Sequence, residues 1–376
     1  MFTPGSLLPR PAAAIVGLAL LLCLSVACGD GSGSASKPLG PAVTRAASQG
    51  DPRGIRLGFS SLPPANSSDA AIGAFATIAE YGEVALIQHV PPWNDFLPGG
   101  KISSATTDRT RFETTLLDQY KGLKRFYAID PTDGVVQRAR IADLPSSIDP
   151  QAGFADPALR SAFLSYTAYV VKNYRPDYLA LGVEINMLLE RSPRQFDAFT
   201  SLYRQAYDVA KAASPKTKVF PTFQLEDLQG TFGDIHPPHW EVLDPFRGKM
   251  DALAVSTYPF QAELRSAGDL APDYYSQLKD HFKGEILISE AGYASAPVEG
   301  QVNVGTEEDQ QTFLARLLGD ADASGFSMVI WYAALDPGFV AGGAASVFKD
   351  IGLRKSNGSN KLAWATWEEW SRRPLR

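Results

Sequence analysis

Residues 178–191, YLALGVEINMLLER, begin like a buried strand and end in polar groups. The run up to Leu181 and Gly182 is apolar and typical of a strand that is covered on both faces. A carboxylate, Glu184, and an amide, Asn186, follow at once. We therefore expect this strand to carry Glu184 at its carboxyl end.

The same kind of apolar run recurs along the chain, separated by segments of helical character. The expected strands are 55–60, 84–90, 123–130, 178–186, 218–226, 251–260, 285–293 and 326–336. Eight strand–helix units predict an α/β fold, a (β/α)8 TIM barrel, in which catalytic groups gather at the carboxyl ends of the strands. The alternative is an open doubly wound sheet, which usually has a Gly-rich phosphate loop after its first strand; GFSSLPPANSS, residues 58–68, is not one.

Several of the intervening helices show start signals. Asp156-Pro157 and Ser192-Pro193 each place a capping residue before a proline that suits the first helical turn. Thr306 followed by Asp309 resembles a capping box. We expect helices to begin at these three places.

The first residues have the features of an export signal. Arg10 precedes AAAIVGLALLLCLSVAC, an apolar run that is somewhat short for a membrane-spanning helix, which is the alternative. LSVAC resembles a bacterial lipobox with Cys28 as the lipid-modified residue, although Ser25 stands where Leu is usual. We predict a lipoprotein signal peptide over 1–27, a flexible Gly/Ser/Pro/Ala-rich tether over 28–53 and a single barrel domain over 54–376. The chain would then be exported and anchored by lipid to the bacterial cell envelope or surface.

Composition excludes several functional classes. The 376 residues are 45% hydrophobic and 20% charged, with a net charge of −6, so no basic field for nucleic acid exists. The only cysteines are Cys23 and Cys28, and cleavage of the signal before Cys28 leaves no thiol pair for a disulfide or a metal. His236 and His239 lack a third ligand at a recognisable spacing, so we expect a loop there and no metal. No cofactor is expected, and we expect a monomer.

Two carboxylates stand at strand ends: Glu184 after the fourth strand and Glu290 after the seventh. A barrel brings both over the same axial mouth, although 106 positions separate them. Two facing carboxylates are what glycoside hydrolysis requires, because one protonates the leaving oxygen while the other attacks the anomeric carbon or activates water. The alternative is that both are solvated residues of the rim.

The motifs at these strand ends resemble those of the clan A glycoside hydrolases, a group of retaining TIM-barrel enzymes. LALGVEIN and ILISEAGY resemble its fourth and seventh strand motifs, which implies Glu184 as the acid/base and Glu290 as the nucleophile. STYPF implies that Tyr258 hydrogen-bonds the nucleophile, and VIWYAALD implies that Trp331 floors a sugar subsite. One departure is Val183, where the clan usually has an Asn that binds the sugar 2-hydroxyl. The pattern matches no single family of the clan.

Other strand-end residues are candidates for substrate binding. Trp93 could stack on a sugar face, and Asn186 could partly replace the missing Asn. The remaining candidates are polar residues at or near the ends of the second and fifth strands: His89, Asn94, Gln224 and Glu226. Glu226 is also the main rival to the two proposed catalytic carboxylates.

The sequence thus predicts a retaining glycoside hydrolase that cleaves a β-linked polysaccharide or oligosaccharide outside the cell. The pKa of Glu184 would be raised by the neighbouring carboxylate so that it can act as the acid. Aromatic residues near the strand ends favour an elongated cleft and endo action. Two alternatives remain open: a surface lipoprotein that binds glycans without cleaving them, and a transglycosylase that uses the same two carboxylates.

Overall fold

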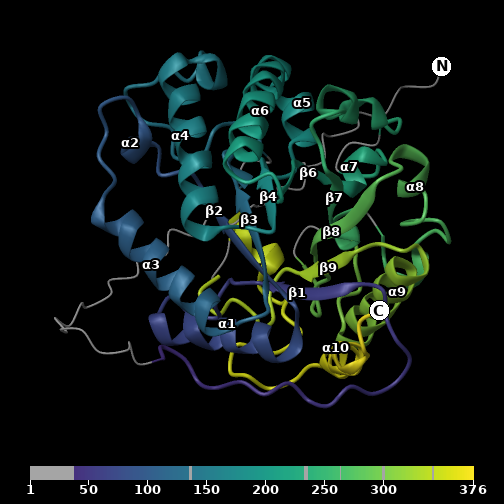
Figure 1. The fold of residues 1–376 in the computed structure, drawn as a ribbon. Helices are drawn as coiled ribbons and strands as arrows, with labels where there is room; N and C mark the ends of the chain where they lie inside the picture. The colour runs from purple at the N-terminus through teal and green to yellow at the C-terminus, as the bar shows by residue number, and fades with distance from the viewer. Residues whose placement is uncertain (1–37, 135–137, 233–235, 263, 299–300, 341–342) are drawn as a thin grey trace, which may run out of the picture.

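The computed structural model describes residues 38–134, 138–232, 236–262, 264–298, 301–340 and 343–376. Within these ranges, parallel strands form a barrel with helices packed around it (Figure 1). The strands are β1 (Arg56–Ser60), β2 (Val84–His89), β3 (Lys124–Ile129), β4 (Tyr178–Leu181), β5 (Lys218–Phe220), β6 (Thr222–Gln224), β7 (Ala252–Thr257), β8 (Glu285–Ala291) and β9 (Met328–Trp331). The prediction of a TIM barrel is confirmed.

The nine strands make eight staves of the barrel, because β5 and β6 are one stave interrupted at Pro221. Proline has no N–H to give to a sheet ladder. The sheet order is β5-β4-β3-β2-β1-β9-β8-β7-β6, and neighbours pair in parallel. Thr222 N–H donates to Gly182 O at 3.0 Å, and Asp251 N–H donates to Val219 O at 2.9 Å. The first bond joins β6 to the residue after β4, and the second joins β5 to the residue before β7. The two ends of the strand order are thereby connected, and the barrel closes.

The helices mostly follow the strands in alternation. The α-helices are α1 (Ser68–Tyr81), α2 (Trp93–Phe96), α3 (Ser104–Gln119), α4 (Pro157–Tyr174), α5 (Asn186–Arg191), α6 (Pro193–Ala213), α7 (Leu225–Leu228), α8 (Leu278–His281), α9 (Glu307–Ala323) and α10 (Leu362–Arg372). Short 3-10 turns are η2 (Gly153–Ala155), η3 (Trp240–Phe246), η4 (Pro259–Gln261), η5 (Ala267–Asp269) and η6 (Gly343–Phe348).

The three predicted helix starts are confirmed, with differences in detail. The Asp156 carboxylate accepts from the N–H groups of Ala158 and Leu159 at the start of α4. Ser192 caps α6 by position, but its side chain makes no capping bond. Thr306 Oγ1 accepts from Asp309 N–H at 3.1 Å, whereas the Asp309 carboxylate turns to other donors, so only half of the capping box forms.

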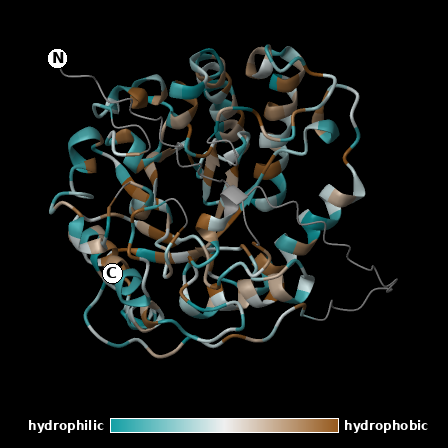
Figure 2. Ribbon diagram, turned by 180° about the vertical axis from the view of Figure 1, so that it is seen from behind, coloured by the Kyte–Doolittle hydropathy of each residue, from teal (hydrophilic) through white to brown (hydrophobic). Residues whose placement is uncertain are grey.

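The core lies inside the barrel and between the barrel and its helices. Hydrophobic and hydrophilic residues are mixed along the ribbons of the surrounding helices (Figure 2). On α6, the expected face of Phe196, Phe199, Tyr203 and Ala206 is buried. Burying each such Phe contributes roughly 1.5–3 kcal/mol. The ring of Phe199 also lies only 2.7 Å from where a Cβ on Gly182 would stand, so a larger residue after β4 would clash with α6.

Residues 38–53 differ from the expected tether. Gln119 bonds Gly40 through both N–H and C=O, and Arg53 is buried with its guanidinium 2.6 Å from Glu83 Oε1. Gln49 N–H also donates to the carbonyl of Arg372, the last residue of α10, and Arg53 N–H donates to the carbonyl of Pro374 just beyond that helix. The segment therefore contacts the folded domain at both of its ends, where backbone groups of Gly40, Gln49 and Arg53 have partners on it. The folded unit begins before residue 54.

The predicted signal peptide and Cys28 lie outside the described residues. Among the residues that the structure does describe, none of the helices combines the length and hydropathy needed to cross a membrane.

Candidate active site

Glu184 lies in a strained turn beyond β4 rather than in the strand itself. β4 ends at Leu181, Gly182 has φ +101°, and Glu184 has φ +49°. A left-handed conformation costs a non-glycine residue roughly 1–2 kcal/mol. The turn is held because Glu184 N–H donates to Thr222 Oγ1 at 2.9 Å, and Ile185 N–H donates to Thr222 O at 3.0 Å. The strain aims the carboxylate over the barrel mouth.

The strand β7 links Glu184 to Glu290. Ser256 pairs in register with Glu290, and its hydroxyl donates to Glu184 Oε1 at 2.6 Å. Two residues further on, the Tyr258 hydroxyl donates to Glu290 Oε2 at 3.0 Å. The hydrogen bond that the sequence resemblance implies for Tyr258 is therefore present. Both carboxylates gather at the carboxyl end of the barrel, in contact with one strand.

Arg138 completes this group from the long loop after β3. Its Nε and Nη2 donate to Glu184 Oε2 at 3.2 and 3.1 Å, and its Nη1 donates to Asp130 Oδ1 at 2.6 Å. All three side chains are buried. Arg138 also has a left-handed backbone, with φ +64°. Two strained residues thus meet in one buried ion pair, which is common where a site is built at the expense of stability.

Burial, followed by the charge of Glu184, raises the pKa of Glu290 to about 8, although Arg138 and the Tyr258 hydroxyl act in the opposite direction. The pKa of Tyr258 is raised by burial and by the charge of Glu290. The pKa of Arg138 is raised by Asp130 and Glu184, although burial opposes this. With this pKa, the Glu290 carboxyl group carries a proton at neutral pH. The titration belongs to the pair rather than to either residue alone.

The ninth strand presents Tyr332, not Trp331, to this group. Trp331 is wholly buried, donates from Nε1 to Ile351 O at 2.9 Å, and packs against Phe313 of α9. Tyr332 lies 6.4 Å from Tyr258 between ring centroids, and its pKa is raised by burial and then by Glu290. Side chains alternate between the two faces of a strand, so adjacent residues cannot both face the mouth. Trp331 therefore faces the helices, and Tyr332 is the residue next to Tyr258 and Glu290.

The same alternation separates Gln88 from His89 in β2. His89 Nε2 lies 2.7 Å from Glu113 Oε1 of α3, so His89 faces the helices. Gln88 donates to Asp130 Oδ2 at 3.0 Å, and its Oε1 is buried without a hydrogen-bond partner. Gln88, rather than His89, therefore contacts the group around Arg138 and has an acceptor left for a ligand.

The other predicted ligands of the second strand do not join the group. Trp93 is buried, and its Nε1 donates to Ala142 O at 2.8 Å. It anchors the loop between β3 and α4 and offers no open ring to a sugar. Asn94, the next residue, is exposed on α2.

Asn186, Gln224 and Glu226 form a structural network behind the mouth. Asn186 opens α5, bonds Gln224 backbone groups at 3.0 and 2.8 Å and also bonds Asp227. Glu226 is fully buried and accepts from Gln224, Thr257, Tyr258 N–H and Tyr274. Since protein donors surround its carboxylate, Glu226 acts as a brace between β6 and β7.

A separate group could hold a metal. His236 and His239 lie with Glu190 and Asp227, and one donor atom from each lies within 4.8 Å of the others. The expectation of no metal site rested on the lack of a third ligand, and the fold supplies two carboxylates from other segments.

The arrangement around Glu184 and Glu290 has the parts for acid–base chemistry: two buried carboxyl groups, of which Glu290 has a raised pKa, an arginine, and two tyrosine hydroxyls. Neither protein-family models nor curated protein sequences give a match to this chain. Solved structures do. A GH5_18 protein from Bifidobacterium longum subsp. longum, in complex with Manβ1-4GlcNAc, is 15% identical with a TM-score of 0.63, over 86% of this chain and 80% of that one.

Two further structures share the fold. An exo-β-1,4-mannosidase from Opitutaceae bacterium strain TAV5 is 16% identical with a TM-score of 0.66, over 88% of this chain but 62% of that one. A β-glucosidase from Thermotoga maritima is 13% identical with a TM-score of 0.53, over 77% and 84%. At this identity the likeness concerns the fold. The resemblance to the clan A glycoside hydrolases is confirmed at that level, without assignment to one family.

Proposed function

We propose that this chain is a retaining glycoside hydrolase that cleaves a β-linked glycan outside the cell, where a lipid on Cys28 anchors it. Glu290 is the proposed nucleophile and Glu184 the proposed acid/base. The observation that supports this most is the pair itself: two buried carboxyl groups at the ends of β4 and β8, of which Glu290 has a pKa raised to about 8 by burial and by the charge of Glu184. No cofactor is required for this reaction.

The proposed reaction needs a proton on Glu184. In the first step Glu290 attacks the anomeric carbon as a carboxylate, while Glu184 protonates the departing oxygen; in the second step Glu184 takes a proton from water. In the resting site the guanidinium of Arg138 pairs with Glu184, while burial and the charge of Glu184 favour the proton on Glu290. The resting state is therefore one proton shift away from the reactive state, and substrate must draw Arg138 from Glu184.

The sugar that this chain would cleave is proposed from the similar structures. One of the similar structures is a complex with Manβ1-4GlcNAc, and another is an exo-β-1,4-mannosidase. Aryl β-mannosides are therefore the first substrates to test, followed by other aryl β-glycosides and dyed polysaccharides. Trp93 and Trp331 gave the expectation of an endo-acting cleft, and both are buried. Product analysis decides between endo and exo action.

A second candidate function is glycan binding without cleavage. The ion pair between Arg138 and Glu184 favours it, as does the apolar, buried Val183 at the position where a 2-hydroxyl ligand is usual in the clan. A transglycosylase would use the same two carboxylates and differ only in its acceptor.

Azide rescue of the two alanine variants tests the proposal. Glu184→Ala should still form the glycosyl-enzyme from an activated aryl glycoside, and azide, which needs no base, should release the β-glycosyl azide. Glu290→Ala should be nearly inert, and azide should yield the α-product by direct attack. The opposite pattern would reverse the two roles. Wild-type protein that binds glycans but turns over none of the panel would establish the binding function instead.

A further inference from the structure

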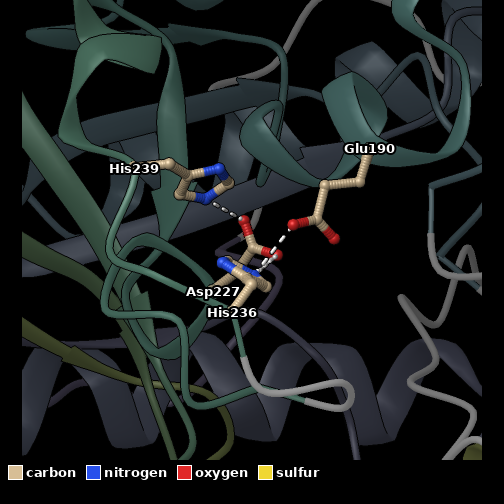
Figure 3. A group of neighbouring side chains, drawn as sticks. All are labelled: Glu190, Asp227, His236 and His239. Atoms are coloured by element: carbon tan, nitrogen blue, oxygen red, sulfur yellow. Dashed lines mark hydrogen bonds and ion pairs between the residues drawn. The ribbon is translucent and has the colours of Figure 1, made fainter.

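Four side chains from three separate segments converge in one group (Figure 3). Glu190 belongs to α5, Asp227 to α7, and His236 and His239 to the segment that precedes η3. Each of these segments follows the carboxyl end of β4 or β6. The convergence is a product of the fold, since 37 residues along the chain separate Glu190 from Asp227.

The spacing of the donor atoms resembles a tetrahedral coordination shell. His236 Nε2 lies 2.8 Å from Glu190 Oε1 and 3.9 Å from Asp227 Oδ1, and His239 Nε2 lies 3.0 Å from Asp227 Oδ2. Ligands about 2.0–2.1 Å from a tetrahedral Zn²⁺ stand about 3.3 Å from one another. The three distances bracket this value, although the two histidines approach different oxygens of Asp227, and one donor atom from each of the four residues lies within 4.8 Å of the others. Side-chain adjustments of roughly 1–1.5 Å would bring the four donors to the tetrahedral spacing.

Two features point the donors inward. His236 Nδ1 lies 2.9 Å from Pro237 O, which fixes the proton on Nδ1 and leaves the lone pair of Nε2 toward the cluster. Metal-binding histidines usually donate their other ring N–H to such a group. Asp227 is fully buried, and its Oδ1 has no hydrogen-bond partner although it faces His236. A buried carboxylate oxygen without a donor is costly unless a cation or a donor satisfies it.

We propose that Glu190, Asp227, His236 and His239 bind one divalent transition-metal ion, with Zn²⁺ the best fit. Imidazole nitrogens and carboxylate oxygens suit Zn²⁺, whereas Mg²⁺ and Ca²⁺ prefer an all-oxygen shell. Two carboxylates and two neutral imidazoles also balance the charge of a divalent ion. All four positions are supplied by protein, so the site is structural rather than catalytic.

The metal would brace the turn that carries Glu184. Asp227 also accepts from the Asn186 side chain, and Asn186 stands two residues after Glu184 at the start of α5. Glu190 is a second point on the same short helix. An ion that joins α5 to α7 and to the segment before η3 would therefore limit the motion of the turn, independently of whether the barrel cleaves glycans.

The test is titration of the full-length, chelator-treated protein with ZnCl2 by calorimetry, with thermal unfolding measured in parallel. Wild type should bind one equivalent, and its Tm should rise with Zn²⁺ concentration, because a ligand that binds only the native state stabilises it. His236→Ala and His239→Ala should each weaken binding at least about 10- to 100-fold, the loss seen even for outer-shell partners. Glu190→Gln removes a ligand charge at an exposed position and should weaken binding without unfolding the protein.

His281→Ala is the matched control, because His281 stacks on Trp240 outside the cluster. It should bind Zn²⁺ as wild type does. Wild type that shows no binding beyond that of the His236→Ala/His239→Ala double variant would overturn the proposal and leave the four residues as a hydrogen-bonded network. Equal affinity of Glu190→Gln and wild type would overturn the assignment of that ligand.

Discussion

Replacing Glu290 with Gln should make the protein more stable, by a margin that grows with pH. Glutamine keeps the shape of the side chain and an acceptor for the Tyr258 hydroxyl, but it has no proton to lose. The pKa of Glu290 is about 8 in the folded chain, because the side chain is buried and lies near the charge of Glu184. In the unfolded chain a glutamate titrates near 4.3.

The stability of wild type depends on pH because the native and unfolded states bind different numbers of protons at Glu290. Between pH 4.3 and about pH 8 the native state holds a proton that the unfolded state has released, so the stability of wild type falls as the pH rises. Each unit of pKa difference corresponds to about 1.4 kcal/mol, which limits the whole effect to roughly 5 kcal/mol. Because Glu184 shares the titration, we expect the advantage of Glu290→Gln to grow by about 2–4 kcal/mol between pH 5 and pH 8.

Urea unfolding of both proteins at pH 5, 6, 7 and 8 measures this difference. Glu369→Gln, at an exposed position on α10, controls for the substitution itself. The reasoning would be refuted if the stability difference between wild type and Glu290→Gln were constant over this range to within about 0.5 kcal/mol.

Three further predictions concern the pH profile, Arg138 and Cys28. Because catalysis needs the proton of the pair, kcat/KM should fall tenfold per pH unit above about 8, and a profile that stays flat to pH 9.5 would contradict the pKa of Glu290. Arg138→Ala leaves Asp130 and Glu184 as unpaired buried charges and should lower the free energy of unfolding by about 3–5 kcal/mol, as measured by denaturant titration; a loss below 1 kcal/mol would argue against the ion pair. A fatty-acid analogue should label wild type in cells and miss Cys28→Ala, because Cys28 is the proposed site of lipid attachment. The attached acyl chains would hold the protein to the membrane by about 0.8 kcal/mol per buried CH2. Equal labelling of both proteins would refute the anchor.

The periodic features of the chain could be predicted from the sequence. Long apolar runs of strand length and helix caps such as Asp156 are local signals, and they led to the barrel and to the right strands. Once the barrel was assumed, the positions of Glu184 and Glu290 at one mouth followed from topology alone. The break at Pro221 was visible in the sequence as well, although its effect on the stave was not predicted.

The directions of side chains could not be predicted as well. Neighbouring residues in a strand face opposite sides of the sheet. An uncertainty of one residue in where a strand ends therefore decides whether Trp331 or Tyr332, and whether His89 or Gln88, faces the barrel mouth. Arg138 lies in a long loop without periodicity, and nothing in the sequence near it announces an ion pair with Glu184.

The group of Glu190, Asp227, His236 and His239 was missed for a related reason. Its ligands come from three segments, and the sequence shows only the two histidines close together. Spacing along the chain identifies metal sites whose ligands share one loop or helix, and it fails when the tertiary structure assembles them.

The most direct test of the proposed mechanism is to find which carboxylate becomes glycosylated. Glu184→Ala, mixed with the activated aryl β-glycoside that wild type hydrolyses best, should accumulate a covalent intermediate, because water then lacks its general base. After rapid quenching and proteolysis, mass spectrometry should find one sugar on the peptide that contains Glu290. A sugar on any other carboxylate, or hydrolysis by wild type with no adduct in Glu184→Ala, would contradict the account.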